Sequence, residues 1–303
     1  MLTISLGRRA RQFSKLVRHS ALARRTGRAH KPVLASPSEL GMTFIGHSSF
    51  FVQINGVNLL IDPVFARWLF VLKRLRQPGL KIKDLPPIDL VLVTHAHFDH
   101  LHRPSLRAIV RHTLRMRGNS PTLIVPGHVS DLVSDLGFGD IIALDWWQDY
   151  EHLGLTITHT PARHWGARVV HDVHRGYGGY VIRSGGASLY HAGDTAYFPG
   201  FREIGERLHP ELAMLPIGAY DPPPFRNVHT SPADAVRAFR ELRARWLVPM
   251  HYGSFRLSHE PMDEPLKLLA SEARKARLDD RLLVLREGVT QLFESRADVS
   301  SVV

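Results

Sequence analysis

The 303-residue chain contains no cysteine. This absence excludes disulfides, thiolate zinc fingers and cysteine nucleophiles, so any metal must be held by His, Asp or Glu side chains. The chain also lacks a glycine-rich phosphate loop ahead of a helix, and no serine triad is evident. Water activated as hydroxide is then the natural nucleophile for any hydrolysis.

Long apolar runs are missing as well. No apolar region of adequate length follows the N-terminal arginines, which argues against a secretory signal, and no run could span a bilayer. The composition, 44% hydrophobic and 22% charged, is that of a soluble globular protein. We therefore expect a cytoplasmic protein, with peripheral attachment to a membrane as an option.

Acidic residues are absent from the first 38 positions. Residues 1–31 hold nine of the 39 Lys and Arg residues, which leaves 30 bases against 28 acids in the rest of the chain. The net charge of +11 thus belongs to a tail, and the near-neutral body argues against a nucleic-acid partner. We predict a basic N-terminal extension over residues 1–40 and one catalytic domain over residues 41–296.

Two segments suggest a membrane partner. In the tail, apolar residues one helical turn apart alternate with basic ones: Phe13, Leu16, Val17, Arg11, Lys15 and Arg18. This pattern suits a basic amphipathic helix on an anionic membrane, and the alternative is a solvated tail. Residues 64–80 are apolar and basic, which fits a membrane interface or an acyl-chain groove; the alternative is a helix packed on the core.

The densest chemical signal follows an apolar strand at residues 90–93. Four metal-capable side chains come within six positions: His95, His97, Asp99 and His100. A strand end holds side chains rigidly, and the turn after it lets them converge. Histidine and carboxylate donors are the ligand set of zinc, iron and manganese sites.

Three more metal-capable residues, His164, Asp194 and His251, also follow strands. Together with the motif they form a sensible two-metal site. One metal would take His95, His97 and His164. The other would take Asp99, His100 and His251, with Asp194 bridging the two. We expect two divalent ions, with zinc preferred and iron or manganese compatible.

Other residues near the motif receive supporting roles. Asp62, at a strand end, can orient a ligand histidine. His229, in a proline-rich loop, is a candidate catalytic residue, either as a general acid or as a donor to a substrate phosphate. A purely structural role suits four other histidines better than a hydrogen bond to a metal ligand: His47, His128, His159 and His191.

Strand and helix signals alternate along the body. Asn55-Gly56 predicts a hairpin between residues 50–54 and 57–61. Helices are expected over residues 129–136, from Ser231 onward and over residues 263–276. Strands are expected at residues 282–285 and 290–293. This alternation predicts helices packed on a sheet, an α/β fold.

Residues 94–100 (Thr-His-Ala-His-Phe-Asp-His), with His164, Asp194 and His251, resemble the metallo-β-lactamase superfamily. Within it, the chain is similar to the N-acyl-phosphatidylethanolamine-hydrolysing phospholipase D group over residues 42–293. The resemblance implies a four-layer αββα sandwich, with two mixed sheets and helices on the outer faces, and a dinuclear zinc site. One departure is His102, where the family usually has Asp.

The resulting expectation is a zinc-dependent hydrolase that uses a metal-bridging hydroxide on a phosphodiester of a lipid or similar amphiphile, with Asp99 and His229 as catalytic residues. A lactonase or amide hydrolase on the same metals is the first alternative. A non-catalytic membrane-associated protein that retains the metal site is the second. The sequence gives no indication of an oligomeric state.

Overall fold

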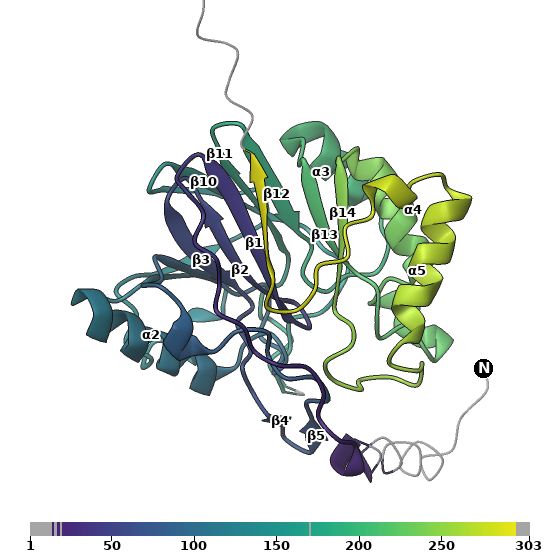
Figure 1. Ribbon diagram of the computed structural model, residues 1–303, viewed down its shortest axis with the longest axis horizontal. Helices are drawn as coiled ribbons and strands as arrows, with labels where there is room; N and C mark the ends of the chain where they lie inside the picture. The colour runs from purple at the N-terminus through teal and green to yellow at the C-terminus, as the bar shows by residue number, and fades with distance from the viewer. Residues whose placement is uncertain (1–13, 15–16, 19, 170, 295–303) are drawn as a thin grey trace, which may run out of the picture.

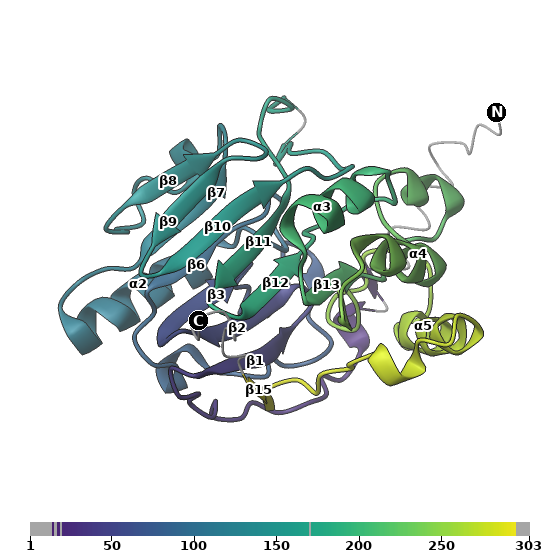
Figure 2. The same ribbon diagram turned by 90° about the horizontal axis from the view of Figure 1, so that it is seen from above.

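Two β-sheets pack face to face, and helices cover both outer sides (Figures 1 and 2). The computed structural model describes residues 14, 17–18, 20–169 and 171–294. The first sheet has the order β15 (Thr290–Glu294), β1 (Glu39–Gly46), β2 (Ser49–Ile54), β3 (Val57–Ile61), β6 (Leu90–Leu92), β7 (Thr122–Pro126) and β8 (Ile141–Leu144). The second has the order β14 (Trp246–Met250), β13 (Leu212–Pro216), β12 (Ala187–His191), β11 (Gly179–Ser184), β10 (Leu155–Thr160) and β9 (Asp149–His152).

Both sheets are mixed. In the first, β1, β2 and β3 are antiparallel, whereas β3, β6, β7 and β8 are parallel. Helix α2 (Arg103–Arg117) covers the outer side of this sheet, and α3 (Gly200–Leu208), α4 (Pro232–Leu242) and α5 (Glu264–Lys275) lie on the side of the second (Figure 2). The expected four-layer αββα sandwich is confirmed.

Side-chain alternation along the strands explains the layers. Phe50 and Val52 on β2 point into the core between the sheets, while Phe51 joins the cluster that packs under α2. On β6, Leu90 and Leu92 face the inner core, and Val91 faces α2. A strand buried on both faces reads as a continuous apolar run, which is why this one was visible in the sequence.

Several expected elements differ from the structure. Residues 129–136 do not form a helix; only a short 3₁₀ turn, Ser130–Leu132, is present. Four Ser and Asp residues in this stretch compete for backbone hydrogen bonds, and Ser134 Oγ donates to the Asp131 carbonyl. Residues 282–285 are not a strand and make a single bridge, Leu247 with Leu282. Helix α3 and strand β9 were not anticipated.

Residues 64–80 do not form a helix packed on the core. They contain a β-hairpin, β4 (Trp68–Leu69) and β5 (Leu72–Lys73), whose turn residues Phe70 and Val71 are 73% and 47% exposed. Its inner side is buried, since Leu69 packs against Phe255 in a small separate cluster. The alternative of a helix packed on the core is therefore wrong, because two short strands bury alternate residues instead.

Residues 20–26 of the N-terminal extension are tied to this hairpin (Figure 1). Ser20 Oγ accepts a hydrogen bond from Lys73 N at 2.8 Å, and Lys73 Nζ donates to the carbonyls of Ala21 and Ala23. Thr26 forms a bridge with Arg76. Most of the amphipathic pattern around Phe13 lies outside the described residues. No helix within the described ranges is long and apolar enough to cross a bilayer.

Candidate metal centre

The motif residues sit in the turn between β6 and α2. Helix α2 starts directly after it because His102 acts as the N-cap: its Nδ1 accepts a hydrogen bond from Ser105 N at 3.2 Å. Pro104 in the first turn strengthens this start. His102 therefore supplies the helix cap that an Asp would otherwise supply, and it leaves the preceding turn free to present its donors.

The structure brings all seven predicted ligands together. One group of donor atoms, all within 4.8 Å of one another, comprises His95, His97, His164 and Asp194. A second such group comprises Asp99, His100, His251 and also His47. Asp194 reaches toward both, since its Oδ1 lies 3.4 Å from His100 Nε2 and its Oδ2 lies 3.9 Å from His95 Nε2.

The distances within the first group suit a small cation. Nε2 of His95 lies 2.9 Å from Nδ1 of His97, and Nε2 of His164 lies 3.3 Å from the same atom. A tetrahedral zinc with Zn–N bonds of about 2.0–2.1 Å separates its donors by roughly 3.3 Å. Ring nitrogens that face one another at these distances need a shared proton or a shared cation.

Buried polar atoms without hydrogen-bond partners also indicate a cation site. Among the described residues, the buried atoms of this centre without a hydrogen-bond partner include His100 Nε2, Asp194 Oδ1, His251 Nε2 and His229 Nδ1. Burying unpaired polar atoms is costly, so such a cluster calls for a ligand. The donors present fit two divalent ions, the group that the resemblance implies.

Hydrogen bonds from neighbouring groups fix the orientation of the donor rings. Asp62, fully buried, accepts hydrogen bonds from Thr94 N and Thr94 Oγ1 and lies 2.6 Å from His100 Nδ1. His164 Nδ1 donates to the carbonyl of Val228 at 2.9 Å. These contacts set which ring nitrogen faces the centre.

Electrostatics divide the histidines into two kinds. Burial lowers the pKa of His95, His97 and His164, so these rings are neutral and carry free lone pairs. Burial is the largest influence on His100 and His251 too and opposes a charge on them, but the neighbouring carboxylates together outweigh it. Asp194 and Asp99 raise the pKa of His251 to about 9, and with Asp62 they raise that of His100 well above its usual value. Without metals, protons on these two rings balance the carboxylates.

His229 lies at the rim of this centre. Its Nδ1 is 3.8 Å from Asp194 Oδ2, and its ring stacks on that of His251 at 5.3 Å. Burial lowers the pKa of His229 to about 4. A neutral imidazole serves better as a hydrogen-bond donor than as an acid. The lowered pKa therefore favours the substrate-contact role of His229 over proton donation.

His47 was expected to be structural, yet its Nε2 donates to Asp99 Oδ2 at 2.9 Å. The sequence offered little signal for this beyond a histidine directly after a strand and a glycine. Of the other three, His191 is buried and donates to the Ser48 carbonyl at 2.9 Å, while His128 and His159 are in neither donor group.

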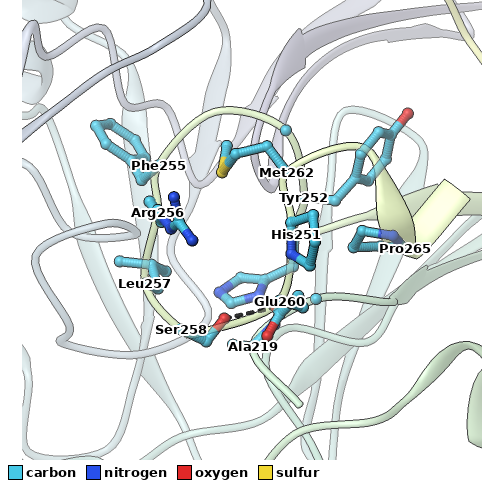
Figure 3. A pocket seen from close by; sticks show the side chains of 13 residues that line it. Ala219, His251, Tyr252, Phe255, Arg256, Leu257, Ser258, Glu260, Met262 and Pro265 are labelled. Atoms are coloured by element: carbon cyan, nitrogen blue, oxygen red, sulfur yellow. Dashed lines mark hydrogen bonds between the residues drawn. The ribbon is translucent and has the colours of Figure 1, made fainter. Parts of the chain in front are cut away.

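A small cavity of about 20 Å³ adjoins His251, with Ser258 and Glu260 in its lining (Figure 3). Glu260 accepts hydrogen bonds from Ala219 N at 2.6 Å and from Ser258 Oγ. The loop after β14 is therefore held to the loop after β13, which keeps both walls of the centre in place. The cavity has room for one water molecule.

Aromatic side chains lie beside the candidate metal centre. Trp165, 43% exposed, lies against His97 and His164 with ring centroids 4.7 and 4.3 Å apart. Phe98, inside the motif, packs edge-on against Phe70 of the hairpin at 4.3 Å. The Arg168 guanidinium lies 3.8 Å over the Phe98 ring and donates to two carbonyls of the motif turn. The hairpin therefore borders the metal centre.

Comparisons with known proteins agree with this architecture. Residues 57–252 match the model of the family described as the β-lactamase superfamily domain. The chain is 31% identical over 271 residues to N-acyl-phosphatidylethanolamine-hydrolyzing phospholipase D 1 of Caenorhabditis elegans, which covers 84% of this chain and 76% of the relative. It is also 31% identical over 252 residues to a UPF0173 metal-dependent hydrolase of Methanopyrus kandleri, with 82% and 97% covered.

A solved structure shares the fold. Igni18, a metallo hydrolase from Ignicoccus hospitalis, aligns with a TM-score of 0.61 at 26% identity over 84% of this chain and 99% of its own. The sequence match, the shared fold and the paired His and Asp donors all lead to one assignment. The chain belongs to the β-lactamase superfamily.

Proposed function

We propose that this protein is a metal-dependent hydrolase that holds two divalent ions, preferably zinc, and cleaves a phosphodiester in a lipid or similar amphiphile. The observation that carries the proposal is the pair of donor groups joined by Asp194. Two such ions, when bound, lower the pKa of a shared water and stabilise the charge that develops on the phosphoryl oxygens.

The protein's own residues would position that chemistry. His95, His97 and His164 would hold one ion, and Asp99, His100 and His251 the other. His229 faces the same space and, as a neutral ring, can donate a hydrogen bond to a phosphoryl or leaving-group oxygen. His229 lies close to Asp194. A substrate oxygen that reaches the centre would therefore be within hydrogen-bond range of the His229 ring.

The aromatic side chains beside the centre support an amphiphilic substrate. Trp165, Phe98 and Phe70 provide an apolar border next to the charged centre, so a polar head could enter while an apolar chain stays at the border. Arg168 adds a positive charge beside it. The C. elegans relative is an N-acyl-phosphatidylethanolamine-hydrolyzing phospholipase D, which supports the choice of a phosphodiester.

An anionic membrane is the partner that this surface fits. Three exposed apolar side chains, Trp68, Phe70 and Val71, lie at the hairpin, and the segment tied to it carries the exposed Arg24 and Arg28. Apolar tips that enter the headgroup layer and basic residues that meet anionic lipids act together at such interfaces. We propose that the enzyme works at the membrane surface.

A substrate panel tests the proposed reaction. Purified protein loaded with zinc should cleave bis-p-nitrophenyl phosphate and phospholipids in vesicles, and should leave simple lactones and amides largely intact. The matched Asp194→Asn variant should lose this activity. Lactone opening without phosphodiester cleavage would replace the proposed reaction with the carbonyl alternative, whereas no hydrolysis at all would favour a non-catalytic role.

A further inference from the structure

His47 lies next to a predicted metal ligand and is almost fully buried, with 1% of its surface exposed. Its Nε2 donates a hydrogen bond to Asp99 Oδ2 at 2.9 Å. The other polar contacts of this oxygen, with His251 Nε2 and His100 Nε2, are longer at 3.6 and 3.8 Å. We infer that His47 is a positioning residue that orients Asp99 for the metal held by Asp99, His100 and His251.

The backbone is shaped to deliver this ring. The pairing of β1 with β2 shifts register between Phe44 and Gly46, and His47 itself has φ of 65°. A non-glycine residue in this left-handed region is uncommon and persists only where the surroundings enforce it. Here His251 N donates to the His47 carbonyl at 2.8 Å, which pins the bulge to the end of β14.

The ring is enclosed on several sides. His251 lies 4.3 Å from it between centroids, and Phe255 meets it edge-on at 5.4 Å. Behind Phe255 lies the fully buried Arg74, 5.0 Å from that ring. A Cβ at Gly46 would come within 2.8 Å of Arg74 Nη2, so the glycine is needed for the close packing. The His47 ring has little freedom to move away from Asp99.

The donor count favours orientation over ligation. Asp99, His100 and His251 with the shared Asp194 already provide four donors, and the remaining position would be taken by the shared water rather than by His47. A fifth protein donor is not required, and a hydrogen bond to a ligating carboxylate is the usual way to fix its direction. His47 therefore acts through Asp99. This inference depends on the two-metal centre of the proposed function.

Two near-isosteric substitutions test the role. In His47→Gln the side-chain amide reaches the position of Nε2 and can still donate to Asp99, whereas in His47→Asn it reaches only the position of Nδ1. Cobalt(II) is titrated into metal-free protein, and the two binding steps are followed by absorbance. In His47→Asn, cobalt binding at the site of Asp99, His100 and His251 should weaken 10- to 100-fold, so that one of the two steps shifts and the other is unchanged. His47→Gln should recover most of the loss.

Controls separate this inference from the proposed function. His112→Gln changes another buried histidine, which contacts the Leu85 carbonyl and lies outside the two donor groups, and should leave both steps as they are. Thermal melting of each variant reports folding. Three outcomes would overturn the role of His47 and leave the proposed function standing. They are equal weakening by Gln and Asn, equal weakening of both binding steps, and two unchanged steps in His47→Asn. A parent protein that binds no cobalt would instead remove the proposed function.

Discussion

Asp62 Oδ2 lies 2.6 Å from His100 Nδ1, and both side chains are fully buried. The same carboxylate accepts hydrogen bonds from the backbone and the hydroxyl of Thr94, so it cannot turn away from the ring. With Nδ1 engaged, His100 presents Nε2 to Asp194, 3.4 Å from its Oδ1. One buried carboxylate thus sets the direction of a ligand in the motif.

Replacing Asp62 with alanine should weaken metal binding by about 10- to 100-fold, because His100 loses the group that orients it. Competition with a chromogenic chelator measures the change. Asp89→Ala, which removes a carboxylate near the opposite end of β6 that binds Arg117, is the matched control. Equal affinities in Asp62→Ala and the parent would contradict the orienting role.

Metal binding should release protons at neutral pH. In the metal-free protein, the pKa of His251 is raised to about 9 and that of His100 is raised as well, so both rings are protonated at pH 7 and must lose that proton to bind. Affinity should therefore fall as the pH drops below 9, by about 10- to 100-fold per unit for one to two protons.

Calorimetry in buffers of different ionisation enthalpy counts these protons directly. His95, His97 and His164 have lowered pKa values and are already neutral at pH 7, so they should contribute none. A titration at pH 7 with no buffer dependence would show that His100 and His251 are neutral before the metal arrives.

The motif was predictable because its four donors are contiguous and follow a buried strand. His164, Asp194 and His251 could be proposed because each comes after a strand, and strand ends meet at one edge of a sheet. His47 could not be assigned, since its contact with Asp99 depends on a β-bulge and a positive φ that the sequence does not reveal.

The elements of the fold also divide into those that the sequence predicts and those that it does not. Hairpin β2–β3 followed from Asn55-Gly56, and the start of α4 followed from Ser231, which forms a capping box with Asp234. The helix expected over residues 129–136 failed because Val129, Val133 and Leu136 have helical spacing but reach the core through turns instead. Periodicity reports which side chains are buried, and several backbone paths can satisfy it.

The hairpin tip should matter for membrane-bound substrates only. Phe70→Ser should lower hydrolysis of phospholipid in vesicles about tenfold, because it removes an exposed aromatic ring worth about 1.5–3 kcal/mol when buried. Hydrolysis of soluble bis-p-nitrophenyl phosphate should change little. Leu114→Ser, at an exposed apolar position on α2, is the control. Parallel loss on both substrates would assign Phe70 to the centre rather than to the interface.

The arginines beside the hairpin should supply an electrostatic part of membrane binding. Arg24→Gln and Arg28→Gln should each weaken sedimentation with anionic vesicles about fivefold at low salt, since each basic residue near the surface contributes about 1 kcal/mol. The exposed pair Arg111 and Arg115 on α2 provides control substitutions of equal charge. If the α2 pair proves equally important, net charge rather than this surface governs binding.

The proposed function depends on one protein chain holding two metal ions joined by Asp194. Elemental analysis of the purified parent and of Asp194→Ala, combined with phosphodiesterase assays, measures this. We predict close to two divalent ions per parent chain, a large loss of both ions in the variant and at least about a 100-fold loss of activity. A parent that cleaves phosphodiesters without bound metal, or a variant that keeps both ions, would contradict it.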